Sequence, residues 1–131
     1  MKQFILLVGN IGTGKTYYTK NYMPKSYNII RPDDFRGDSE HRQSQMIKEI
    51  ENSLENYETT VLDGPNLEKK HRQNMLYFTR KYAFCKKIII DFGPGNENTI
   101  QRVIKSRPQL NENEWRAIHF ENMKIYEKPN I

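Results

Sequence analysis

An eight-residue run near the start of the chain constrains its fold more than any other feature. Residues 9–16 read G-N-I-G-T-G-K-T and match the pattern G-x-x-x-x-G-K-[S/T] at every fixed position. The apolar residues 4–8 precede this run, and a helix-compatible segment, residues 17–23, follows it. A strand, a glycine loop and a helix start, in this order, are the context in which such a loop binds phosphates. The sequence therefore predicts a nucleoside triphosphate site rather than an ordinary glycine-rich turn.

The chemistry expected of this loop follows from its residue types. Glycines let the backbone bend until several N–H groups point inward around a polyphosphate. Lys15 would then reach the β- and γ-phosphates, and the Thr16 hydroxyl would be a ligand of Mg²⁺. Tyr17 and Tyr18 could line an adenine or acceptor pocket or pack on the sheet. We expect ATP and Mg²⁺ as cofactors, with binding by Gly9, Asn10, Ile11, Gly12, Thr13, Gly14, Lys15 and Thr16.

The composition limits the class of protein. A length of 131 residues is enough for one core and predicts a single domain over residues 1–131. The net charge of +5 favours an anionic partner, either a nucleotide or a nucleic acid. Cys85 is the only cysteine, so no disulfide can form within the chain. Because no apolar run approaches the roughly eighteen residues of a membrane span, we expect a cytoplasmic protein without membrane contact. The sequence leaves the oligomeric state open.

Short apolar runs alternate with longer amphipathic segments, a pattern that indicates a parallel α/β sheet. The predicted strands are Gln3–Val8, Tyr27–Ile30, Thr59–Leu62 and Lys87–Phe92. The predicted helices are Gly14–Met23, Ser39–Tyr57, Leu67–Tyr82, Asn98–Lys105 and Asn113–Glu127. Ligands of open parallel sheets bind beyond the carboxyl ends of the strands. Polar clusters follow all four predicted strands, so we expect the functional residues there.

The segment after the second predicted strand, R-P-D-D-F-R at residues 31–36, carries two carboxylates and two arginines. A kinase needs a carboxylate that orients the attacking hydroxyl and accepts its proton. An arginine can grip an anionic acceptor, bidentately where geometry allows. The alternative is that Asp33 or Asp34 caps a helical turn and that Arg36 is simply solvated. The residues alone leave both interpretations open.

The glycine loop, the Ile-rich second strand and the Asp-Asp-aromatic-Arg segment together resemble the kinase domain of polynucleotide 5′-hydroxyl kinases, especially the bacteriophage form. The resemblance implies that Asp33 is the general base and that Arg36, with Asp34 beside it, binds the acceptor strand. Pro32 stands where the family commonly has an arginine. Because proline pushes the preceding Arg31 toward extended geometry, the acceptor is less well defined by the resemblance than the reaction.

The third predicted strand ends in Asp63, as in a Walker B element. Asp63 would hold Mg²⁺ through water, because this ion keeps much of its hydration in proteins. The alternative is an ordinary turn aspartate. Asn66 follows shortly afterwards and is the predicted cap of the helix from Leu67.

A short basic helix follows the fourth predicted strand and contains Arg102, Lys105 and Arg107. P-loop kinases have a lid in this position, and the resemblance assigns Arg107, and less securely Arg102, to charge stabilisation during transfer. Whether Arg102 or Lys105 assists Arg107 stays open, and a solvated basic face is the alternative. The final predicted helix is expected to pack rather than take part in the chemistry, with Trp115, Ile118, Phe120 and Met123 toward the core.

The resemblance implies one P-loop domain with a sheet in the order 2-3-1-4, flanked by helices, and without the phosphatase domain of some members. It implies ATP-dependent transfer of a phosphoryl group to the 5′-hydroxyl end of DNA or RNA. Two alternatives stay open. The first is a kinase of the same fold that acts on a nucleoside, a nucleotide, hydroxymethylated-base DNA or a sugar nucleotide. The second is a nucleotide-dependent binding protein without transferase activity.

Overall fold

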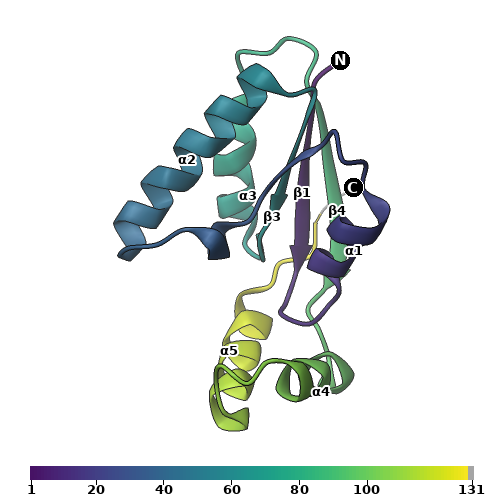
Figure 1. Cartoon of the computed structure of the whole chain (residues 1–131), viewed down its shortest axis with the longest axis vertical. Helices are drawn as coiled ribbons and strands as arrows, with labels where there is room; N and C mark the ends of the chain where they lie inside the picture. Colours follow the sequence, from purple (N-terminus) through teal and green to yellow (C-terminus); the bar gives the residue numbers. More distant parts are fainter. Residues whose placement is uncertain (130–131) are drawn as a thin grey trace.

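The computed structural model describes residues 1–129, and a four-stranded sheet forms its centre (Figure 1). The strands are β1 (Gln3–Gly9), β2 (Asn28–Ile30), β3 (Thr59–Asp63) and β4 (Lys86–Gly93). They lie in the order β2-β3-β1-β4, and every neighbouring pair is parallel. The order implied by the resemblance is confirmed, and each predicted strand is correct to within one residue at either end.

The helix α2 (Ser39–Asn56) covers one face of this sheet. Its Ile50 and Leu54 pack in one cluster with Phe4 and Leu6 of β1, and all four side chains are at most 1% exposed. This burial confirms the amphipathic character predicted for the helix Ser39–Tyr57. The strand β1 is thereby fixed at the centre of the molecule.

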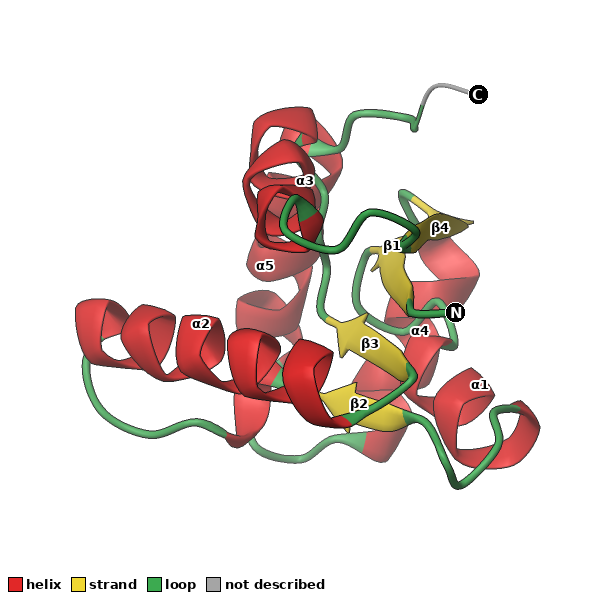
Figure 2. Ribbon diagram, turned by 90° about the horizontal axis from the view of Figure 1, so that it is seen from above, coloured by secondary structure: helices red, strands yellow, loops and turns green. Residues whose placement is uncertain are grey.

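The helix α1 (Lys15–Tyr22) covers the opposite face of the sheet, as Figure 2 shows. Tyr18 packs edge-on against Phe92 of β4, with ring centroids 5.6 Å apart. Ile5 and Leu7 of β1 are buried on the same face as Phe92. The glycine loop therefore lies between a buried strand and a packed helix, which hold both of its ends.

The helix α3 (Lys69–Leu76) is shorter than the predicted one and continues as the 3-10 turn η2 (Tyr77–Thr79). Arg72 in α3 is only 4% exposed. Its guanidinium donates hydrogen bonds of 2.8 Å to the carbonyl oxygens of Asn66, Leu67 and Glu127. Arg72 thus joins α3 both to the segment before it and to the C-terminal segment.

The prediction that Asn66 caps this helix is wrong. Asn66 is buried with φ at +46°, and Glu68 occupies the cap position in an extended conformation. The amide of Asn66 donates instead to the carbonyl oxygens of Leu7 and Leu62, at 2.7 and 3.3 Å. Its side chain therefore ties together the ends of β1 and β3, which the local sequence pattern does not reveal.

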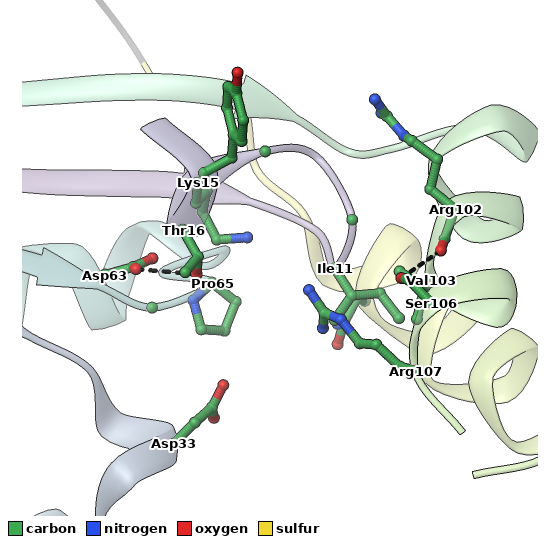
Figure 3. Close-up of a pocket in the computed structure, with 15 residues that line it drawn as sticks. Ile11, Lys15, Thr16, Asp33, Asp63, Pro65, Arg102, Val103, Ser106 and Arg107 are labelled. Carbon is green, nitrogen blue, oxygen red and sulfur yellow. Dashed lines mark hydrogen bonds between the residues drawn. The ribbon is translucent and has the colours of Figure 1, made fainter. Parts of the chain in front are cut away.

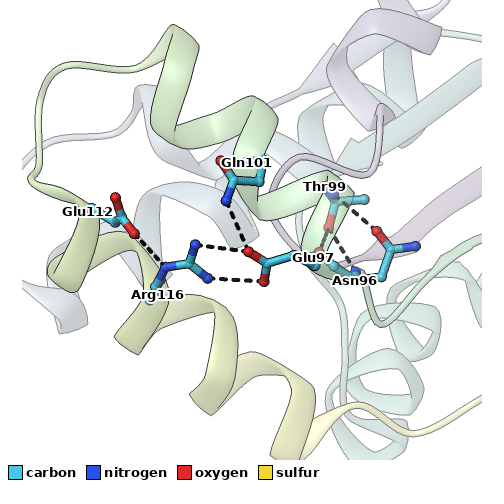
Figure 4. Close-up of polar contacts among 6 residues, drawn as sticks. All are labelled: Asn96, Glu97, Thr99, Gln101, Glu112 and Arg116. Atoms are coloured by element: carbon cyan, nitrogen blue, oxygen red, sulfur yellow. Dashed lines mark hydrogen bonds and ion pairs between the residues drawn. The ribbon is translucent and has the colours of Figure 1, made fainter.

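The helices α4 (Glu97–Ser106) and α5 (Glu112–Ile125) lie together beyond the carboxyl ends of the strands (Figure 1). Figure 4 shows Arg116 of α5 donating two hydrogen bonds, 2.9 and 3.0 Å, to the carboxylate of Glu97 in α4. These bonds lower the pKa of Glu97 to about 2. The two helices are therefore linked as a pair.

The inward face of α5 differs from the predicted one. Ile118, Phe120 and Met123 are 37%, 59% and 42% exposed, whereas His119 is buried. The prediction was wrong because α5 packs through polar side chains against α4 and the glycine loop, not against the apolar sheet. Among the described residues, no helix combines the length and apolarity that crossing a membrane requires.

Candidate active site

A cavity of about 610 Å³ lies where the glycine loop meets the turn after β3, the segment after β2 and the end of α4. It brings together most of the site residues predicted from the sequence: Ile11, Gly12, Gly14, Lys15, Thr16, Asp33, Asp63, Arg102 and Arg107. Figure 3 shows Lys15, Asp33 and Arg107 around the same space, each from a different segment of the chain. Gly9, Asn10 and Thr13 belong to the loop without lining the cavity.

The two central glycines give the loop its shape. Gly12 and Gly14 have φ of +74° and +99°, in the left-handed region that side chains disfavour. A Cβ on Gly12 would collide with the Thr99 carbonyl oxygen and lie 2.6 Å from a methyl carbon of Val103, both in α4. The loop can therefore lie directly against α4 only because position 12 has no side chain.

Lys15 lies at the first position of α1 with its ammonium group folded back on the loop. Its Nζ donates to the carbonyl oxygens of Gly9 and Asn10 at 2.7 and 2.9 Å. Burial lowers the pKa of Lys15 to about 8; Arg107 also lowers it, while Asp63 and Asp33 raise it. The charge is thus only partly compensated, as suits a group that receives an anion.

Thr16 and Asp63 meet as a pair suited to magnesium. The Thr16 hydroxyl donates to Oδ2 of Asp63 at 3.1 Å, so both oxygens are available at one point of the cavity. Within residues 1–129, no three His, Cys, Asp or Glu side chains gather as a metal site. This donor set fits Mg²⁺, which proteins hold through one or two oxygens together with waters and substrate phosphates.

Arg31 is a further partner of Asp63 that the sequence did not predict. Its Nε lies 3.3 Å from Oδ2 of Asp63 without a hydrogen bond, and its Nη2 donates to the Thr19 hydroxyl at 2.9 Å. Arg31 is extended, as expected before Pro32. It therefore points toward Asp63 and Thr19 rather than toward the exposed residues that follow.

The segment after β2 forms the 3-10 turn η1 (Pro32–Asp34) and presents Asp33 to the cavity. Asp33, Asp34 and Arg36 are all exposed, but of these three only Asp33 lines the cavity. Arg36 donates from Nη1 to the Asp33 carbonyl oxygen at 3.1 Å. The predicted acceptor residues are thus neighbours of the cavity wall and not part of it.

The predicted basic lid corresponds to α4 and the residue that follows it. Arg102 and Arg107 both line the cavity, and the Ser106 hydroxyl donates to the Arg102 carbonyl oxygen at 2.6 Å (Figure 3). Lys105 instead lines a second hollow of about 470 Å³, which Arg102 shares. Of Arg102 and Lys105, only Arg102 lines the same cavity as Arg107.

Several lining residues were missed by sequence reasoning: Gly64, Pro65, Val103, Ser106 and Asn122. Pro65 is exposed and follows Asp63 closely, so the strand end already indicated its neighbourhood. Asn122 comes from α5, which was expected to serve only for packing, and no local motif marks it. Of the two tyrosines after the loop, Tyr17 lines the cavity and Tyr18 packs against the sheet.

No protein-family model matches the sequence, and no curated protein matches it either. Solved structures with a similar fold do exist. A fungal RNA kinase aligns with a TM-score of 0.73 and 22% identity, over 98% of this chain and 67% of that one. A chain of the Pnkp1/Rnl/Hen1 RNA repair complex aligns with a TM-score of 0.66 and 18% identity, over 99% of this chain and 49% of that one.

The APS kinase CysC of Mycobacterium tuberculosis, solved with AMPPNP and APS, aligns with a TM-score of 0.64 and 10% identity. The alignment covers 99% of this chain and 84% of that one. The chain thus spans 84% of the APS kinase chain but only about half of the repair-complex chain. These likenesses and the strand order show that the chain has the α/β fold of P-loop kinases, with a parallel β2-β3-β1-β4 sheet flanked by helices.

Proposed function

We propose that this protein transfers the γ-phosphoryl group of ATP to a hydroxyl group, and that the acceptor is the 5′-hydroxyl end of a DNA or RNA strand. The observation that carries the proposal is the shared cavity, where Lys15, Asp33 and Arg107 surround one space. Phosphate-binding, proton-accepting and charge-stabilising groups are the three components that phosphoryl transfer requires. A nucleotide-dependent switch has no need of the exposed carboxylate beside the loop.

The proposed reaction assigns one role to each of these side chains. Asp33 accepts the proton of the attacking hydroxyl group while the hydroxyl oxygen forms its bond to the γ-phosphorus. The bond from this phosphorus to the β,γ-bridging oxygen breaks, and ADP leaves with that oxygen. Lys15 and Arg107 stabilise the negative charge on the transferring group. Mg²⁺, held by Thr16 and Asp63, would neutralise phosphate charge.

Three observations support a polynucleotide acceptor. Asp33 is exposed, so the end of a long strand can approach it without entering a closed pocket. Arg36 lies beside it as an exposed cationic group for a strand phosphate, and the chain carries a net charge of +5. Two of the similar structures are described as an RNA kinase and an RNA repair complex.

The lone cysteine fits the reducing cytoplasm as the place of action.

The test offers labelled ATP to the purified protein with a panel of acceptors. The panel contains 5′-hydroxyl DNA and RNA oligonucleotides, the same strands with a 5′-phosphate, nucleosides, nucleotides and a sugar nucleotide. We expect labelling of the 5′-hydroxyl strands alone. Labelling of a small acceptor instead would keep the kinase and change its substrate. Slow ATP hydrolysis that no acceptor accelerates would overturn the transferase proposal.

The role of Asp33 is tested in the same assay. Asp33→Asn should lower kcat by about a hundredfold or more, because general-base catalysis contributes on that scale, while MgATP affinity is retained. Glu49→Gln, on the exposed face of α2, is the matched carboxylate-to-amide control and should behave as the unmodified protein. Unchanged turnover in the Asp33 variant would remove the general-base assignment.

A further inference from the structure

Asn10, at the second position of the glycine loop, has a fully buried side chain that faces away from the cavity. Its Oδ1 accepts from the Ile11 backbone N–H at 2.7 Å and from Nδ2 of Asn122 at 3.0 Å. Its Nδ2 lies 2.9 Å from the Pro94 carbonyl oxygen, and 3.0 and 3.2 Å from the carbonyl oxygen and Nδ1 of His119.

The surroundings leave the Asn10 amide one orientation. The Ile11 N–H can only donate, and the carbonyl oxygens of Pro94 and His119 can only accept. If the amide oxygen and nitrogen of Asn10 exchanged places, the NH2 group would face the N–H of Ile11, and the oxygen would face the carbonyl oxygens of Pro94 and His119. Nδ2 has two hydrogens and three neighbouring polar atoms, namely the two carbonyl oxygens and Nδ1 of His119. Every polar atom of the Asn10 side chain is thus bonded to the loop or to a distant element.

The backbone of the same residue holds the phosphate-binding lysine. The Asn10 carbonyl oxygen accepts from Nζ of Lys15 at 2.9 Å and from the Thr13 hydroxyl at 2.7 Å. The Ile11 N–H, bonded to the side chain of Asn10, fixes the plane of the peptide to which this carbonyl belongs. The direction of the carbonyl, and with it the position of Lys15, therefore depends on the partners of the Asn10 side chain.

Those partners come mainly from α5 and its contact with the turn after β4. Gly95 in this turn has φ of +81°, and a Cβ there would lie 2.9 Å from Cε1 of His119 and 3.3 Å from Cβ of Asn10. The turn can pack this closely only because position 95 is glycine. Arg116, one turn before His119, binds Glu97 of α4. The helix α5 is therefore bonded both to α4 and to the glycine loop.

We propose that His119 and Asn122 of α5 are positioning residues for nucleotide binding, which act through the Asn10 side chain to hold the loop and Lys15 in the phosphate-binding arrangement. This inference rests on the proposed function only in taking MgATP as the ligand of the loop. It assigns to α5 a part in the site that neither its apolar pattern nor any local motif indicates. His119 does not line the cavity, so its effect on the nucleotide must pass through Asn10.

The experiment measures the dissociation constant of MgATP by calorimetry for a matched set of variants. His119→Phe removes the acceptor at Nδ1, whereas His119→Asn keeps an acceptor oxygen near that position. The bond from Asn10 to the carbonyl oxygen of residue 119 remains in both. We expect His119→Phe to weaken binding about three- to tenfold, the effect of one buried hydrogen bond. His119→Asn should stay within about twofold of the unmodified protein.

Asn122→Ala supplies a second measurement at a half-buried position. It removes the hydrogen bond from Asn122 to Oδ1 of Asn10, and we expect it to weaken MgATP binding about three- to tenfold. Asn113→Ala, at an exposed position of the same helix, is the control and should bind MgATP normally. In steady-state assays, the KM for ATP should rise in the His119→Phe variant while the KM for the acceptor strand stays constant. A purely structural role would lower the melting temperature without this selectivity.

The outcomes separate the inference from the function on which it rests. If the unmodified protein binds MgATP and both His119→Phe and Asn122→Ala bind it equally well, the inference is overturned and the proposed function stands. If only Asn122→Ala weakens binding, Asn122 contacts the nucleotide directly and the path through Asn10 is overturned. If the unmodified protein does not bind MgATP at all, the proposed function falls and takes the inference with it.

Discussion

At the scale of single residues, Lys15 is a buried cation whose charge the protein compensates only in part. Lys15 is largely desolvated, and its pKa is lowered to about 8 by burial and by Arg107. Two loop carbonyl oxygens are its hydrogen-bond partners, and no carboxylate forms an ion pair with it among the described residues. A triphosphate would supply the missing countercharge. If Lys15 binds phosphate as proposed, it does so at some expense in stability, a compromise common at functional sites.

This compromise predicts opposite effects of one substitution on activity and on stability. Lys15→Met should lower kcat by about a hundredfold or more, because it removes an electrostatic contact to the transferring group. Its melting temperature should equal or exceed that of the unmodified protein, because a desolvated charge is replaced by an apolar side chain of similar length. The labelled-ATP assay and thermal unfolding measure the two effects. A variant that loses several degrees would show that Lys15 holds the loop together.

We expect His119 to make the stability of the protein depend on pH. Burial is the main cause that lowers the pKa of its imidazole below 6.5, with Arg116 acting in the same direction and Glu97 against it. As the pH falls below about 6.5, the unfolded chain takes up a proton that the folded protein resists. The free energy of unfolding should therefore decrease between about pH 7.5 and 5.5.

Denaturant unfolding across this pH range measures the effect, and His119→Asn is the comparison because it has no titrating imidazole. The decrease should be smaller in this variant and should not vanish, since burial also lowers the pKa of His71. Equal slopes in the two proteins would show that His119 does not resist protonation.

At the scale of elements, the loop and α4 form one packed unit rather than a site and a separate lid. Gly12 brings the loop against Thr99 and Val103 in the helix, and Val103 is only 1% exposed. Arg107 is the first residue after α4, and its backbone N–H donates to the Val103 carbonyl oxygen at 2.9 Å. A shift of the loop therefore moves the residue proposed to stabilise transfer.

Comparing two glycine substitutions tests this packing. Gly12→Ala combines a positive φ with a collision against backbone, so we expect it to lower MgATP affinity by at least about tenfold and stability by several kcal/mol. Gly14→Ala has a positive φ but no atom within 4 Å of the new Cβ. Its stability loss should stay near the 1–2 kcal/mol that is roughly the penalty of the left-handed conformation. Equal losses would mean that contact with α4 is unimportant.

At the scale of the whole molecule, Arg72 holds together parts of the chain that are far apart in sequence. Its guanidinium bonds to three carbonyl oxygens, including that of Glu127 after α5. Arg72→Ala should lower the free energy of unfolding by about 3 kcal/mol, because two buried carbonyl oxygens and one part-buried one lose a charged donor. Lys70→Ala, at an exposed position of the same helix, should change it by less than about 0.5 kcal/mol. Similar values for the two variants would assign Arg72 no structural role.

The parts of this molecule that could be predicted from sequence are those determined locally. The strands are short apolar runs, and the residues of the glycine loop that line the cavity lie within one continuous motif. Asp33 and Asp63 were predicted because parallel strand ends meet at one edge of a sheet. The strand order came from a resemblance, which carries information that local patterns do not.

What could not be predicted depends on contacts between distant segments. The buried face of α5 is polar because its partner is a loop more than a hundred residues earlier, so the apolar pattern of the helix pointed to the wrong side. Asn66 resembled a cap by its position, yet its amide joins two strand ends. Arg31 could be expected to be extended, but nothing in its neighbourhood indicated that it approaches Asp63.

The union of residue 10 with residues 119 and 122 has a consequence for biosynthesis. A ribosome completes the first strand and its glycine loop long before it reaches the codons for α5. Until that helix emerges, the amide of Asn10 has only water and nearby backbone for partners, although β1 and α1 have already been made. The glycine loop therefore gains its last side-chain partners only after α5 has been synthesised, and a transcript cut short before α5 would yield a chain in which Asn10 lacks them.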